Sequence, residues 1–215
     1  MRGDIILVGE EHRRAASSIV ESLVDDISST DRPFTLTVAG ESGSGKSETA
    51  QALAEALAEH GLRTVVLQQD DYYVLPPRSN AAARRANFCW VGTTEVRLDV
   101  LDSHLQAAQA GAPSIVKPLV IFDEDRIDEE TISLEGADVV IAEGVYTSLC
   151  DHVDRRVFID RNRLETLPHR LQRGRETADP FLERVLIREH EIISPHRARA
   201  DIVISRDYEV EFVRG

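Results

Sequence analysis

Short apolar runs alternate with amphipathic stretches along most of the chain. The apolar runs are rich in Val, Ile and Leu and predict buried strands at residues 34–39, 64–71, 139–144, 155–160 and 200–205. Apolar residues three or four positions apart predict helices at residues 10–29, 48–61, 95–110 and, for the most part, 163–193. Nearly continuous apolar strands with helices between them are typical of a parallel sheet covered on both faces. We therefore expect an α/β fold.

Two segments depart from this alternation. Residues 114–122 and 131–136 predict a β-hairpin around the acidic run DEDRIDEE, which we expect to be a solvated turn. Residues 76–92 contain prolines, an asparagine and a glycine, and predict a loop with room for a short helix. Residues 1–32 are expected to be a helical extension packed on the core, and residues 33–215 the main domain.

The amino-acid composition limits which classes of partner this chain can bind. The chain has 215 residues, of which 42% are hydrophobic and 29% charged, and a formal net charge of −13. An acidic chain is a poor match for a nucleic-acid backbone, and no apolar run is long enough to cross a bilayer. The first apolar run is too short for a signal peptide. We expect a cytoplasmic protein with reduced thiols at Cys89 and Cys150 and no nucleic-acid or membrane partner.

A glycine-rich segment, GESGSGKS, lies between the first predicted strand and a predicted helix. Its spacing matches G-x-x-x-x-G-K-[ST], a loop whose backbone N–H groups surround phosphate oxygens. Lys46 can reach the β- and γ-phosphates, and the Ser47 hydroxyl can bind Mg²⁺. The segment predicts a nucleoside triphosphate site. Its candidate residues are Gly40, Glu41, Ser42, Gly43, Ser44, Gly45, Lys46, Ser47 and Glu48.

Carboxylates follow two of the other predicted strands. Asp70 and Asp71 stand where one apolar run ends, and Glu143 ends the run VVIAEG. The carboxyl ends of parallel strands are where ligands bind in such sheets. Phosphoryl transfer to a hydroxyl needs a carboxylate that takes the proton and oxygen ligands for Mg²⁺. We expect this acidic edge to serve both purposes, with either aspartate open as the base.

A third signal is the basic cluster HRLQRGRE, which contains Arg170, Arg173 and Arg175. Guanidinium groups can meet the charge that spreads over a transferring phosphoryl group. We therefore predict a helical lid at about residues 163–180 that closes over the triphosphate and excludes water.

These pieces, in this order, resemble the uridine kinase and phosphoribulokinase family of P-loop kinases over about residues 34–205. The matching stretches are AGESGSGKS, QDDYY, NF, IAEGVY, VFID, RGR and SPHRARADIVI. The resemblance implies a three-layer P-loop kinase fold with a central parallel sheet, a small β-hairpin excursion and a helical lid. It also implies ATP- and Mg²⁺-dependent phosphorylation of a hydroxyl on a small metabolite.

The same resemblance implies roles for particular residues. Asp70 corresponds to the general base, and Lys46 and Arg173 act with it in catalysis. Ser47, Asp70 and Glu143 gather around Mg²⁺, and Arg173 and Arg175 touch phosphates from the lid. Tyr73 lies near the acceptor.

The acceptor side departs from the family pattern. Uridine–cytidine kinases continue NF with an aspartate that holds the ribose, whereas Cys89 and then Trp90 follow Phe88 here. Phe88 and Trp90 are either core residues or stack on the acceptor, and Phe122 and Arg170 are further acceptor candidates. A nucleoside, nicotinamide riboside, pantothenate, and sugars or polyols stay open as acceptors, as does a homo-oligomer. The alternative function is a P-loop NTPase or nucleotide switch acting on a protein partner.

Overall fold

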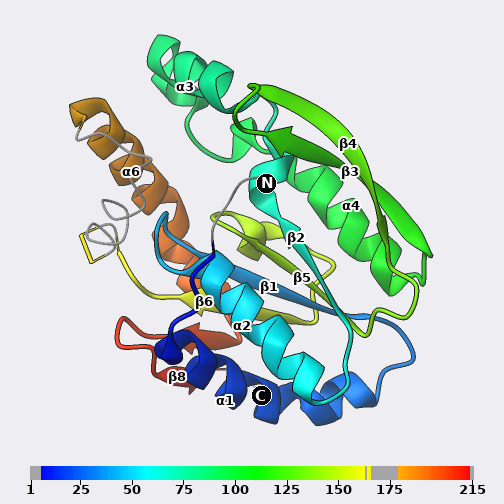
Figure 1. Ribbon diagram of the computed structural model, residues 1–215. Coiled ribbons are helices and arrows are strands. Elements are labelled where there is room, and N and C mark those ends of the chain that lie inside the picture. Colours follow the sequence, from blue (N-terminus) through cyan, green and yellow to red (C-terminus); the bar gives the residue numbers. More distant parts are fainter. Residues whose placement is uncertain (1–5, 163, 166–178, 214–215) are drawn as a thin grey trace.

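A six-stranded sheet forms the centre of the computed structural model, which describes residues 6–162, 164–165 and 179–213 (Figure 1). Its strand order is β2-β5-β1-β6-β7-β8. The strands are β2 (Thr64–Gln68), β5 (Val139–Gly144), β1 (Phe34–Gly40), β6 (Arg155–Ile159), β7 (Ile202–Ile204) and β8 (Val210–Phe212). The first five run parallel, and β8 pairs antiparallel with β7 at the edge. The α/β prediction is confirmed, whereas the short edge strand β8 was missed.

Helices cover both faces of this sheet, as the pattern predicted. α1 (Glu10–Ser28) and α2 (Lys46–Glu59) share one apolar core with Val139 and Ile141 of β5. Helix α4 (Leu98–Gln109) packs in a second core with Val140, on the opposite face. Successive side chains of a strand point to opposite faces, so a strand apolar throughout supports two cores. The result is a three-layer architecture (Figure 1).

The strand predicted at residues 64–71 ends earlier, at Gln68. The next four residues form the 3₁₀ turn η1 (Gln69–Tyr72). Gln69 turns inward, and its Oε1 accepts a hydrogen bond from the Tyr146 N–H at 2.7 Å. Asp71 is only 2% exposed, so it too turns away from solvent. The two aspartates therefore lie in a turn rather than in the strand.

The hairpin consists of β3 (Ser114–Ile121) and β4 (Arg126–Ser133). Its turn is tighter than predicted, because Asp125 adopts a left-handed conformation with φ of 51°. Most of the acidic run therefore lies in β4, where Glu130 pairs with Lys117, and not in a solvated turn. A period of two places Lys117 on the same face as the buried Ile115.

The segment at residues 76–92, predicted as a loop with room for a short helix, contains the helix α3 (Pro77–Ala86). Proline at the first helical position suits the helix geometry. The cap comes from the hairpin: Asp125 Oδ1 accepts from the Arg78 N–H at 2.6 Å, and its Oδ2 accepts from the Ser79 hydroxyl at 3.0 Å. A cap supplied from residue 125 cannot be recognised in the local sequence. Two 3₁₀ turns follow, η2 (Phe88–Trp90) and η3 (Thr93–Glu95).

The remaining elements lie on the C-terminal side of β5. They are the 3₁₀ turn η4 (Thr147–Leu149), helix α6 (Pro180–Ile193) and the 3₁₀ turn η5 (Ser194–Arg199). Of the predicted helical region at residues 163–193, α6 is confirmed, and most of the predicted lid lies outside the described residues. Within the described ranges, no helix is both long and apolar enough to span a membrane.

Candidate active site

The predicted phosphate loop joins β1 to α2. Gly43 and Gly45 have φ values of 77° and 97°, a left-handed conformation that L side chains rarely adopt. The Lys46 Nζ donates to the Glu41 carbonyl at 2.9 Å, so the lysine folds back across the loop. The Ser44 hydroxyl is buried and makes no hydrogen bond to the part of the chain that is described. Loop amides, a lysine and a helix N-terminus together fit a polyphosphate.

Gly45 is also required by what lies behind it. A Cβ at this position would lie 2.9 Å from His12 Nε2 and 3.0 Å from the Tyr208 hydroxyl. Those two groups are hydrogen-bonded to each other at 3.0 Å. The first helix and the connection between β7 and β8 therefore meet at the back of the phosphate loop.

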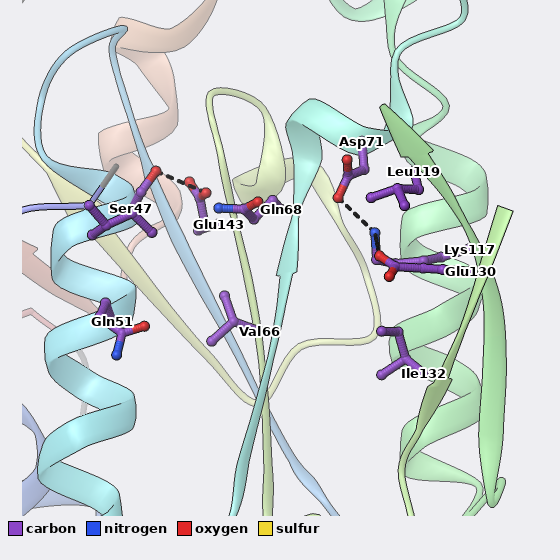
Figure 2. A pocket seen from close by; sticks show the side chains of 11 residues that line it. Ser47, Gln51, Val66, Gln68, Asp71, Lys117, Leu119, Glu130, Ile132 and Glu143 are labelled. Carbon is purple, nitrogen blue, oxygen red and sulfur yellow. Dashed lines mark hydrogen bonds and ion pairs between the residues drawn. The ribbon is translucent and has the colours of Figure 1, made fainter. Parts of the chain in front are cut away.

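The side chains of Glu143, Asp70 and Ser47 lie in front of this loop, and we call this group the carboxylate corner. The sheet register pairs Gln68 of β2 with Glu143 of β5, so the ends of both strands lie side by side. The Ser47 hydroxyl donates to Glu143 Oε1 at 3.0 Å, as Figure 2 shows. Burial and then the charge of Asp70 raise the pKa of Glu143 to about 7. The charge of Lys46 and the Ser47 hydrogen bond act in the opposite direction without cancelling this shift, so a divalent cation beside the two carboxylates would be stabilised.

The donor set at this corner suits Mg²⁺. Among the described residues, no three His, Cys, Asp or Glu side chains gather as a metal cage. Mg²⁺ commonly binds through one or two carboxylates, waters and substrate phosphates. Ser47 and Glu143, with Asp70 close enough to shift the pKa of Glu143, have this composition.

The two adjacent aspartates have different surroundings. Asp71 is buried: its Oδ2 accepts from Lys117 Nζ at 2.6 Å, and its Oδ1 accepts from the Val120 N–H at 3.0 Å. These contacts fasten the hairpin to η1. Asp70 is exposed at the surface of the turn. Asp70 is thus the more accessible of the two carboxylates, as a proton acceptor requires.

Helix α6 contacts the outer side of the phosphate loop. Glu41 Oε1 lies 2.5 Å from His190 Nδ1, and the Ser42 hydroxyl donates to Glu189 Oε2 at 2.9 Å. Glu189 also lies 3.4 Å from the Arg84 guanidinium, which binds both carboxylate oxygens of the buried Glu95. The side chains of Glu41 and Ser42 thus bind to α6. Their backbone groups can therefore line the phosphate site.

The predicted aromatic residues of the acceptor side do not form one pocket. Phe88 packs edge-on against Phe181 of α6, with ring centroids 6.0 Å apart. The Trp90 Nε1 donates to Asn80 Oδ1 at 2.7 Å. These contacts connect η2 to α6 and to α3.

The other acceptor candidates are scattered. Cys89 and Phe122 are exposed, the latter by 44% beside the hairpin turn. Tyr73 is half-buried, and burial raises its pKa well above the usual value, with Arg84 opposing. Arg170, Arg173 and Arg175 lie outside the described residues.

A cleft of about 300 Å³ opens from the carboxylate corner, between α2 and the hairpin with β2 as its floor (Figure 2). Its lining residues are Ile6, Ser47, Gln51, Val66, Gln68, Asp71, Lys117, Leu119, Glu130, Ile132 and Glu143. The sequence did not lead us to expect that the hairpin forms one side of this cleft. One signal was present: the chain has only two lysines, Lys46 and Lys117, and the second stands at an inward position of a strand.

A parallel sheet with a phosphate loop after its first strand and helices on both faces is the architecture of P-loop kinases. The model of the Phosphoribulokinase / Uridine kinase family matches residues 35–212. The chain therefore belongs to this family, and it is a small-molecule kinase.

Individual relatives agree with this placement. A uridine kinase of Leuconostoc citreum (strain KM20) is 26% identical over 186 residues, which are 80% of this chain and 87% of the relative. The structure of a possible uridine kinase from Bacillus stearothermophilus superposes with a TM-score of 0.65 at 20% identity, covering 90% and 98% of the two chains. A D-glycerate 3-kinase from Cryptococcus neoformans gives a TM-score of 0.63 at 16% identity, covering 95% and 99%. The structural likenesses support the fold alone.

Proposed function

We propose that this kinase transfers the γ-phosphoryl group of ATP, with Mg²⁺, to a hydroxyl group of a small metabolite in the cleft. The observation that carries the proposal is the 3.0 Å contact between Ser47 and Glu143, in front of the phosphate loop and on the wall of the cleft. Phosphate-binding groups, metal-binding oxygens and an acceptor-sized space thereby adjoin one another.

The phosphate side consists of the loop and its lysine. The loop amides and Lys46 bind the phosphate oxygens and stabilise the charge that develops on the leaving group. Ser47, Glu143 and Asp70 are the proposed metal ligands. Mg²⁺ held by these residues would neutralise negative charge on the phosphates. The lid arginines Arg173 and Arg175 are proposed to contact the same phosphates.

Asp70 is the proposed general base. As the acceptor oxygen forms its bond to the γ-phosphorus, the bond from phosphorus to the β–γ bridging oxygen breaks and ADP leaves. The hydroxyl proton passes to the Asp70 carboxylate. Asp71 is unsuited to this role, because both of its oxygens are engaged by Lys117 and the Val120 N–H.

The test is ADP release with Mg·ATP across uridine, cytidine, nicotinamide riboside, pantothenate, glycerate and several sugars and polyols. We expect at least one compound to raise ADP release and to gain one phosphoryl group per ADP, as seen by mass spectrometry. Lys46→Ala should lose nucleotide binding and turnover together. ATP hydrolysis that no compound changes, with no phosphorylated product, would contradict the proposal.

A further inference from the structure

The amine of Lys117 lies inside the cleft wall, between two carboxylates. Its Nζ donates to Asp71 Oδ2 at 2.6 Å and to the Pro118 carbonyl at 2.9 Å, and it forms an ion pair with Glu130 Oε1 at 2.8 Å. Lys117 therefore holds both carboxylates in place.

Of these two carboxylates, Glu130 is the one that opens to the cleft. The side chain of Glu130 is 33% exposed, whereas those of Lys117 and Asp71 are 4% and 3% exposed. In Figure 2, Glu130 lies beside Lys117 on the hairpin, across the cleft from α2. A carboxylate accepts hydrogen bonds from hydroxyl groups.

The cleft carries more negative than positive charge. Its lining has three carboxylates, those of Asp71, Glu130 and Glu143, and one cationic side chain, that of Lys117. A triphosphate at Ser47 keeps a net negative charge even when one divalent cation is bound to it. An acceptor with its own carboxylate or phosphate would meet repulsion in a partly enclosed space, where charges are weakly screened.

The rest of the lining suits a polyol better than a flat ring. Gln51 and Gln68 contribute amides, and Val66, Leu119 and Ile132 contribute aliphatic surface. None of the residues described as lining the cleft is aromatic. Amides and a carboxylate beside aliphatic surface match a molecule with hydroxyl groups along a short carbon chain or ring.

We propose that the acceptor is an uncharged, hydroxyl-rich metabolite of the sugar or polyol class, and that Glu130 determines this specificity by accepting hydrogen bonds from its hydroxyl groups. The inference rests on the proposed kinase function and names the substrate class of that site. By this inference acidic compounds are not acceptors, and a nucleobase on the acceptor does not improve its binding.

The first test compares neutral compounds with their acids: glycerol with glycerate, D-ribose with D-ribonate, and D-glucose with D-gluconate, with uridine alongside. Acceptor-dependent ADP release gives kcat/KM for each. We expect a neutral polyol or sugar to exceed its acid at least tenfold and to exceed uridine. Preference for an acid or for uridine would overturn the inference and leave the proposed function standing. No phosphorylated product from any compound would contradict both.

The second test uses neighbouring glutamates of β4. Glu130→Gln removes the charge at the cleft and should raise the KM of the best acceptor roughly tenfold, with kcat changed less than about threefold. Glu129→Gln changes the same group at the adjacent exposed position and should leave both constants unchanged. Equal KM values for the two variants, at similar melting temperatures, would show that Glu130 does not contact the acceptor.

Discussion

Asp70 and Asp71 share one short turn but belong to two different environments. Asp71 is buried against Lys117, and Asp70 is exposed and close enough to Glu143 to raise its pKa. Asp71 thus positions the hairpin, while its neighbour Asp70 is the carboxylate that we propose as the base. Adjacent residues differ in this way because a 3₁₀ turn directs successive side chains to different sides.

The two cysteines differ just as sharply, which gives a direct test of the side-chain environments. Burial and then the charge of Asp102 raise the pKa of the Cys150 thiol to about 12, whereas Cys89 is exposed. The thiolate is the reactive form, so at pH 8 only Cys89 should react quickly with a disulfide reagent. We expect one thiol per native chain and two after unfolding. Fast labelling that persists in Cys89→Ser would contradict this placement.

Residues whose role depends on local sequence were predictable, and residues whose role depends on tertiary contact were not. Ser47 and Gly45 follow from a motif of eight adjacent positions. The engagement of Asp71 by Lys117 joins residues 46 positions apart, and no spacing rule relates them. The positions of Phe88 and Trp90 likewise depend on tertiary contacts with α6 and α3. The sequence alone therefore cannot show whether these two rings lie near the acceptor.

One buried ion pair, between Lys117 and Asp71, fastens the hairpin to η1, beside the apolar contacts of Ile115 and Ile132 with the core. Lys117→Met should leave Asp71 buried without its cation and lower the free energy of unfolding by about 3–5 kcal/mol. Asp71→Asn combined with Lys117→Met should cost less than the sum of the single changes, because the two residues interact directly. Urea denaturation measures all three.

The matched control lies on the partner strand. Arg126 pairs with Glu124 and Asp128 but is 52% exposed, so Arg126→Met should change stability by less than about 1 kcal/mol. If Lys117→Met were no more destabilising than Arg126→Met, the ion pair would not be what anchors the hairpin.

Elements with strong periodicity were predicted well, and elements stabilised from elsewhere were not. β1, β5 and α2 carry their pattern in their own residues. α3 takes a cap from Asp125 of the hairpin, so its sequence alone indicated only a loop with room for a short helix. β8 has only three residues, too few to show a pattern.

The first helix is an integral part of the molecule rather than an appendage. Ile19 is fully buried in the core that contains Leu53 and Leu57 of α2, and His12 reaches the phosphate loop at Gly45. We therefore expect residues 1–32 and the kinase domain to fold as one cooperative unit.

Ile19→Ala tests this expectation. Removing a buried isoleucine side chain should lower the free energy of unfolding by about 2–5 kcal/mol. Glu21→Ala, on the exposed side of the same helix, should change it by no more than about 0.5 kcal/mol. The fluorescence of the single tryptophan, Trp90, and far-UV circular dichroism should report the same shifted transition. Separate transitions for the two probes would mean that α1 unfolds independently.

The assignment of phosphoryl transfer to this edge of the sheet depends above all on Asp70. The measurement to make is acceptor-dependent ADP release by Asp70→Asn, beside ATP binding by the same variant. We expect kcat to fall by about two to four orders of magnitude while ATP still binds, because the hydroxyl proton loses its acceptor. Turnover equal to that of the unaltered protein would contradict the assignment and return the role of base to another group.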